Sequence, residues 1–192
     1  MSESERISLP RREFMISVPF LALGAKFLES SHALDTQSQV HQELLEQVTS
    51  EEAEWIQGSS MAKELLDYFG KDYSCAESLF MVSLRFLEKP EDLVWVAAGF
   101  GGGLGHRDLC GFLTAGIMAI GLASGMLSKE RKEAKEYCKN AVNQYWDCWV
   151  SLAPLHCSDI REKRKSSKAC TRLGQLAAAK TEELIAPTMN PE

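Results

Sequence analysis

A long uncharged stretch near the middle of the chain constrains the fold more than any other feature. The nineteen residues 109–127 contain no charged side chain, and glycine recurs through them. A helix that is apolar on every side must be buried, either in a membrane or in a protein core, and this stretch is long enough to span a bilayer. Several amphipathic segments elsewhere need an apolar helix to pack on. We therefore expect a central core helix that starts after an N-cap at Asp108.

The flanking segments have helical periodicity, and the alternating pattern and turn signals of strands are absent. Residues 74–77 form a capping box, which marks a helix start, and Pro154 ends a long helix. The predicted helices cover residues 36–57, 59–69, 74–88, 128–152 and 166–185, with one more from Pro90 into the glycines. The sequence thus predicts an all-α protein, a single bundle of about six to seven helices around the apolar helix at 109–127.

The first thirty-odd residues resemble a twin-arginine export signal. Arg11 and Arg12 precede Glu13, Phe14 and Met15, an apolar run follows, and residues 31–33 offer a small-x-small cleavage site. The alternative is a chance arginine pair before a short apolar helix. We expect the twin-arginine translocation machinery as a partner. The protein would then be periplasmic or anchored on the outer side of the membrane, touching the membrane only through this signal.

The chain is expected to divide into four parts: the signal at 1–33, an amphipathic helix at 34–58, a cysteine-containing helical domain at 59–186, and a tail at 187–192. Hydrophobic residues make up 45% of the chain, so it is not disordered. The net charge is −6, which argues against nucleic acid as a partner.

Four of the six cysteines lie at or near helix starts: Cys75, Cys110 and Cys170 near the starts of predicted helices, and Cys157 in the turn just before Ser158 and Asp159, which favour a further helix start. Free N–H groups and the helix dipole favour an anion there, so these positions predict lowered thiol pKa values. The other two, Cys138 and Cys148, lie about 15 Å apart within one predicted helix, too far to bridge each other. No Cys-x-x-Cys pair occurs, so thioredoxin-like and zinc-ribbon sites lack local support, and covalent c-type haem is not expected.

A glycine-rich turn at residues 99–105 precedes the apolar helix. It lacks both the spacing and the preceding strand of a dinucleotide-binding loop. It could form an anion-binding nest, but we favour a role in letting the backbone approach another helix. His106 could pair with Cys110 or bind a metal, although a single loop histidine is more often solvated.

These motifs together resemble the C_GCAxxG_C_C family. The resemblance rests on residues 75–78, the run at 99–105, Cys110-Gly111, Cys157 and Cys170, and it covers about residues 59–185. The family consists of small helical proteins named for their cysteines and regarded as redox-active. Its relatives the split-Soret cytochromes add haem-binding motifs that this sequence lacks. Cys138 and Cys148 fall outside the family pattern.

The sequence leaves two classes of function open. In the first, an exported redox protein brings Cys75, Cys110, Cys157 and Cys170 together near the glycine turn. They would then exchange thiols with the disulfides of a redox partner, or hold zinc or an iron–sulfur cluster. In the second, the chain is a disulfide-stapled binding or structural module without catalysis. Both the family cysteines and the expected convergence of helix starts favour the first.

Overall fold

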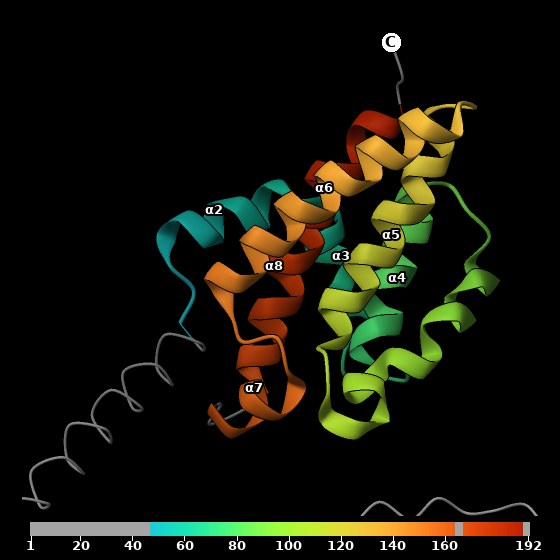
Figure 1. Ribbon diagram of the computed structural model, residues 1–192. Helices are drawn as coiled ribbons and strands as arrows, with labels where there is room; N and C mark the ends of the chain where they lie inside the picture. Colours follow the sequence, from blue (N-terminus) through green and yellow to red (C-terminus); the bar gives the residue numbers. More distant parts are fainter. Residues whose placement is uncertain (1–46, 164–166, 190–192) are drawn as a thin grey trace, which may run out of the picture.

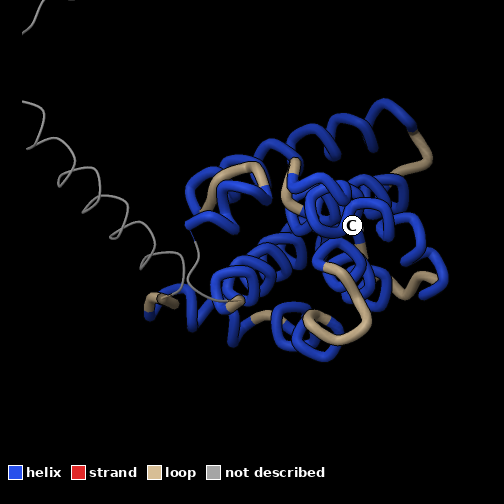
Figure 2. Tube along the Cα trace, turned by 90° about the horizontal axis from the view of Figure 1, so that it is seen from below, coloured by secondary structure: helices blue, strands red, loops and turns tan. Residues whose placement is uncertain are grey.

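A computed structural model describes residues 47–163 and 167–189. Within these residues the chain forms helices joined by short connections and no β-strand, which confirms the predicted all-α fold (Figure 1, Figure 2). The elements are α2 Ser50–Gly58, α3 Ser60–Tyr68, α4 Cys75–Phe86, η1 Glu91–Phe100, η2 Gly103–Arg107, α5 Gly111–Leu127, α6 Arg131–Leu152, α7 Cys157–Lys163, α8 Lys168–Ile185 and η3 Ala186–Thr188.

Helix α5 is the expected central helix, and it packs against α4, α6 and α8. Its side chains Phe112, Leu113 and Ile120 are fully buried. The N-cap is Cys110 and not Asp108 as predicted. The reason is that the chain before the helix is extended, where the Cys110 N–H donates to the Leu155 carbonyl at 2.9 Å. Within the described ranges no helix is both long enough and apolar enough to cross a membrane.

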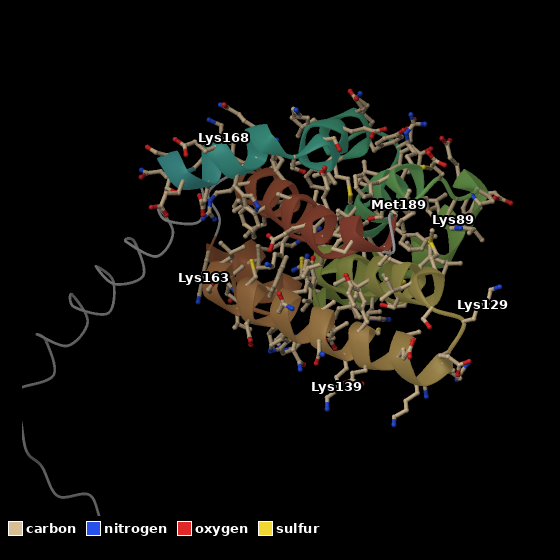
Figure 3. All side chains as sticks on the ribbon, turned by 90° about the horizontal axis from the view of Figure 1, so that it is seen from above. Lys89, Lys129, Lys139, Lys163, Lys168 and Met189 are labelled. Atoms are coloured by element: carbon tan, nitrogen blue, oxygen red, sulfur yellow. The ribbon has the colours of Figure 1, made fainter. Side chains whose placement is uncertain are left out.

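Close contact between α5 and α6 depends on a glycine. A Cβ added at Gly116 would lie 2.3 Å from ring atoms of Tyr145, and the Tyr145 hydroxyl donates to the Phe112 carbonyl at 2.9 Å. The opposite face of α6 is solvated. Lys139 in this helix and Lys129 just before it extend away from the bundle (Figure 3). These contacts explain why one face of α6 is apolar and the other charged.

The predicted helix starts agree with the structure in part. The capping box at the start of α4 is present, with the Ser74 N–H donating to Glu77 at 2.9 Å. Ser128 is not the N-cap of α6. Glu130 takes that position, and its N–H donates to the Ser128 hydroxyl at 3.0 Å. The seven-residue helix α7 has no counterpart among the predicted helices.

Helix α2 packs on α3 and α8. It begins with a capping box in which the Thr49 N–H donates to Glu52 at 3.0 Å. The predicted twin-arginine signal, its cleavage site and the first part of the predicted amphipathic helix at 34–58 lie outside the described residues. Residues 190–192 of the predicted tail lie outside them as well.

Candidate functional site

The starts of α5, α7 and α8 lie at one end of the bundle, the lower end in Figure 1. A pocket of about 230 Å³ at these starts is lined by Cys75, Cys110, Cys157 and Cys170. The other lining residues are Phe69, Ser74, Gly102, Phe112, Ile160, Arg161 and Leu173. The structure therefore brings together all four cysteines that the sequence singled out, although they are spread over almost a hundred positions of the chain.

Cys75 is the first residue of α4, directly after the N-cap Ser74. Its sulfur lies against the start of α5, since a Cβ added at Gly111 would be 2.5 Å from Cys75 Sγ. The same Cβ would lie 3.0 Å from the Phe100 carbonyl oxygen. Only glycine at position 111 therefore leaves room for the Cys75 sulfur beside the first turn of α5.

Two short chain segments hold Cys110 and Cys157. Leu109 and His156 form an isolated antiparallel bridge, and the Cys157 N–H donates to the Asp108 carbonyl at 2.7 Å. Across the same bridge, His156 Nδ1 lies 3.0 Å from Asp108 Oδ1. Cys110 directly follows Leu109, and Cys157 directly follows His156. Both cysteines therefore lie on the same face of the two paired segments, opposite to the face of Leu109 and His156.

The glycine-rich turn brings backbone close to these residues, as the sequence suggests. Gly103 has a φ of +68°, and a Cβ there would lie 2.6 Å from the Asp108 carbonyl oxygen and 2.8 Å from Cys157 Cβ. Both the backbone conformation and the space therefore require glycine. His106 is exposed and does not line the pocket, in agreement with a solvated loop histidine and not with pairing to Cys110.

The predicted lowering of the thiol pKa values is wrong for two of the four cysteines. Burial, together with the nearby Cys75, raises the pKa of Cys110 to about 12. Burial also raises the pKa of Cys75, and the nearby Cys157 and Cys170 thiols raise it as well. Backbone N–H groups act in the expected direction, since those of Gly102 and Ala76 lower the pKa of Cys75. Desolvation outweighs them, because so little water reaches these sulfurs.

Among the described residues, Arg161 is the charged side chain that lines the pocket, and the sequence does not predict it as a site residue. It lies four residues after Cys157 on α7, which places both side chains on the same helix face. The i, i+4 spacing from Cys157 is the signal in the sequence that points to Arg161, but it applies only if residues 157–163 are helical. A guanidinium at the pocket favours any negative charge that develops on a thiol.

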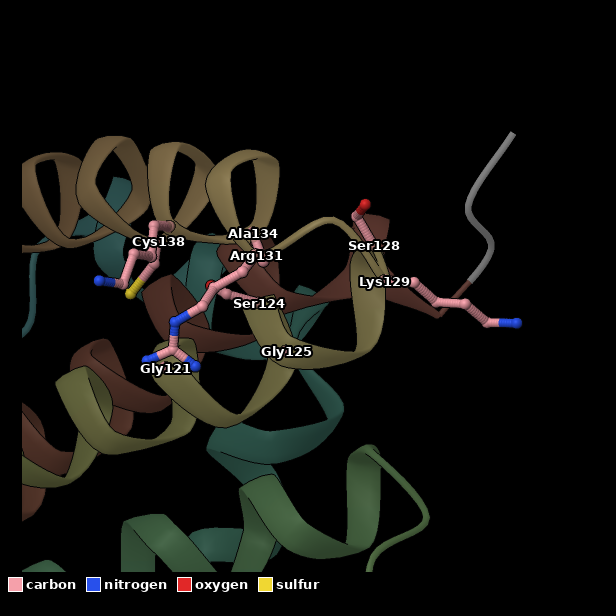
Figure 4. A pocket seen from close by; sticks show the side chains of 9 residues that line it. Gly121, Ser124, Gly125, Ser128, Lys129, Arg131, Ala134 and Cys138 are labelled. Carbon is pink, nitrogen blue, oxygen red and sulfur yellow. The ribbon is translucent and has the colours of Figure 1, made fainter.

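Cys138 and Cys148 lie outside the pocket, as predicted. Cys138 lines a separate cavity of about 350 Å³ at the turn between α5 and α6. There Arg131 extends towards Gly121 on the same side as Cys138 (Figure 4). This cavity holds one thiol, so it offers no second sulfur for exchange.

None of the cysteines is in a disulfide, and all six lie in the described part of the chain. Nor do the described residues include a group of three or more His, Cys, Asp or Glu side chains arranged to hold a metal ion. The pocket is therefore a set of four neighbouring thiols with apolar walls and one arginine.

Comparison with known proteins identifies a family. A family model described as "Putative redox-active protein (C_GCAxxG_C_C)" matches residues 73–184. This range includes all the cysteines of the pocket and the glycine-rich turn. No curated protein and no solved structure matches the chain.

Proposed function

The chain belongs to the C_GCAxxG_C_C family, and we propose that it performs thiol–disulfide exchange in the pocket of four cysteines. The observation that carries this proposal is the meeting of Cys75, Cys110, Cys157 and Cys170 in one pocket. The absence, among the described side chains, of a metal-holding arrangement favours exchange over the zinc or iron–sulfur alternative. The family's redox description supports the same class of chemistry.

In the proposed reaction the Cys75 thiolate attacks one sulfur of an incoming disulfide. A bond forms between Cys75 and that sulfur, the original S–S bond breaks, and the other half leaves as a thiolate. Cys110 then attacks Cys75 Sγ, which releases the second half as a thiol. The pair becomes a disulfide, the substrate gains two electrons, and the two thiol protons pass to the released groups. Cys75 is half-buried and Cys110 is buried, so the substrate meets Cys75 first.

The environment of these thiols suggests the direction of electron flow. A pocket that destabilises thiolates makes each cysteine a poor leaving group, and this makes the disulfide harder to reduce. The raised pKa values of Cys75 and Cys110 therefore favour a pair that donates electrons to other disulfides. Arg161 lines the same pocket and is a positioning residue in this scheme, because a positive charge at the pocket favours a thiolate that forms there.

The rate of exchange should rise steeply with pH. Burial raises the pKa of Cys75 above its usual range, so the thiolate fraction should grow about tenfold for each pH unit below that pKa. The measurement uses the reduced protein and the thionitrobenzoate mixed disulfide of mercaptoethanol, with absorbance reporting release between pH 6 and pH 8.5. A rate that levels off below pH 8 would show that attack by Cys75 is not the step observed.

Protein purified from its native compartment, without added reductant, tests the other classes of function. Metal analysis, a visible spectrum and a thiol count before and after mild reductant are made on protein from its native compartment. Reactive thiols without stoichiometric metal support exchange. Bound metal or a cluster spectrum would replace exchange with metal binding, and disulfides that resist mild reductant would indicate a stapled module.

We also propose export through the twin-arginine route, on the basis of the arginine pair and the apolar run that follows it. Replacing Arg11 and Arg12 by lysine keeps the charge but removes the pair that the translocation machinery recognises. The double variant should remain in the cytoplasm, as measured by fractionation of cells expressing the full chain. Normal export of the variant would remove this assignment.

A further inference from the structure

Element η1 carries large apolar side chains on the surface. Trp95 is 75% exposed, Val96 59% and Leu93 38%. Their exposure does not come from a loose segment, because Val94 and Ala97 of the same element are buried. A cluster of exposed apolar side chains on a firmly packed element is typical of a protein interaction surface.

Beside these side chains lies a groove of about 460 Å³, named here the η1 groove. It is lined by Asp72, Tyr73, Glu77, Met81, Glu91, Asp92, Val94 and Trp95. Four of these eight residues are acidic and none is basic. Glu91 pairs with Arg85, and Glu77 is used in the capping box of α4. Asp72 and Asp92 make no salt bridge to any described residue, so the apolar floor has a negative rim.

The η1 groove and the thiol pocket share the start of α4. Tyr73 and Glu77 line the groove, whereas Ser74 and Cys75 line the pocket. Element η1 also reaches this turn, since a Cβ added at Gly101 would lie 2.5 Å from Ser74 Cβ. Tyr73 of the groove and Cys75 of the pocket are two residues apart, so the two sites adjoin at this turn, about 10 Å from each other by the dimensions of a helix. A single bound chain can therefore reach both.

We propose that the η1 groove docks the protein substrate whose disulfide Cys75 attacks. The inference rests on the proposed exchange and adds the kind of partner. The occupant is an extended segment with an apolar side chain followed by lysine or arginine. Its reactive cysteine lies about three residues away, because an extended chain covers roughly 3.3–3.6 Å per residue. The apolar side chain packs on Trp95, and the basic groups face Asp72 and Asp92.

The test compares two synthetic peptides as probes. Each begins with a cysteine carrying thionitrobenzoate, followed by two glycines and a leucine. One ends in two lysines and the other in two glutamates. The small mixed disulfide of mercaptoethanol serves as the reference that cannot reach the groove. At low ionic strength the lysine peptide should react about tenfold faster than the glutamate peptide, and salt should reduce the difference.

Variants of the groove locate the effect. Trp95→Ala should slow the lysine peptide several-fold and leave the reference reagent unchanged. The double variant Asp72→Asn and Asp92→Asn should bring the two peptides to similar rates. Equal rates for both peptides with the unaltered protein would overturn the docking proposal. If the reference reagent also fails to react, the proposed exchange itself fails, which is a distinguishable result.

Two further measurements address other occupants of the groove. Light scattering gives the mass of the unaltered protein and of Trp95→Ala, and sedimentation with neutral phosphatidylcholine vesicles tests lipid binding. We expect the same mass for both proteins and no vesicle binding. A dimer that Trp95→Ala converts to monomer, or vesicle binding that this variant loses, would overturn the proposal in favour of self-association or of a lipid surface.

Discussion

Replacing Cys75 by serine should lower the rate of disulfide exchange by about a hundredfold or more. A serine hydroxyl cannot form the S–S bond on which the reaction depends. The remaining buried thiol at the start of α5 is a poor substitute, since burial raises the pKa of Cys110 to about 12. The measurement is the release of thionitrobenzoate from its mercaptoethanol mixed disulfide at pH 8. Cys138→Ser is the matched control, because Cys138 lies outside the pocket.

A second variant separates attack from resolution. In Cys110→Ser the first step should proceed, but the mixed disulfide on Cys75 should persist because the proposed resolving thiol is missing. Mass spectrometry of the quenched protein should then find one substrate half attached at Cys75. Exchange that continues at the normal rate in Cys75→Ser would assign the attack to another cysteine of the pocket. Loss of rate in Cys138→Ser as well would indicate a general effect on the fold.

Local signals in the sequence predicted several of the helices and their approximate ends, although the described part of the predicted helix at 36–57 begins only at Ser50. The predicted helix at 59–69 is Ser60–Tyr68 in the structure, and that at 166–185 is Lys168–Ile185. Serine N-cap positions and the glycine after α3 are properties of a few neighbouring residues, so they can be read without knowing the fold. The sequence does not predict the short helix α7, because only two of its seven residues, Cys157 and Ile160, are buried. Two buried positions are too few to show helical periodicity.

The meeting of the cysteines could also be predicted, because each lies near a helix start and one of them precedes the central helix. The protonation of the thiols could not. Helix-start N–H groups are visible in the sequence, whereas the burial that outweighs them at Cys110 depends on what packs there. The contact between Asp108 and His156, 48 positions apart, likewise has no local signal. Exposure of Trp95 belongs to the same class, since an apolar run does not reveal which side faces water.

Replacing Arg172 by methionine should cost about 3 kcal/mol of unfolding free energy. Its side chain is 8% exposed and that of its partner Glu52 is 13% exposed. The Arg172 Nε donates to Glu52 Oε2 at 3.0 Å, and the same carboxylate accepts the Thr49 N–H that begins α2. Methionine preserves most of the volume but leaves a poorly solvated carboxylate without its guanidinium. The measurement is urea unfolding at pH 7, followed by circular dichroism.

Lys180→Met on the same helix is the control. The Lys180–Glu183 pair has one partner 52% exposed, so removing it should cost less than about 1 kcal/mol. Adding Glu52→Gln to Arg172→Met removes the carboxylate charge that has lost its partner. The double variant should therefore lose less unfolding free energy than the sum of the losses in Arg172→Met and Glu52→Gln. If Arg172→Met is no less stable than Lys180→Met, the Arg172–Glu52 pair does not stabilise the contact between α2 and α8. Strict additivity of the two losses would show that the residues do not interact energetically.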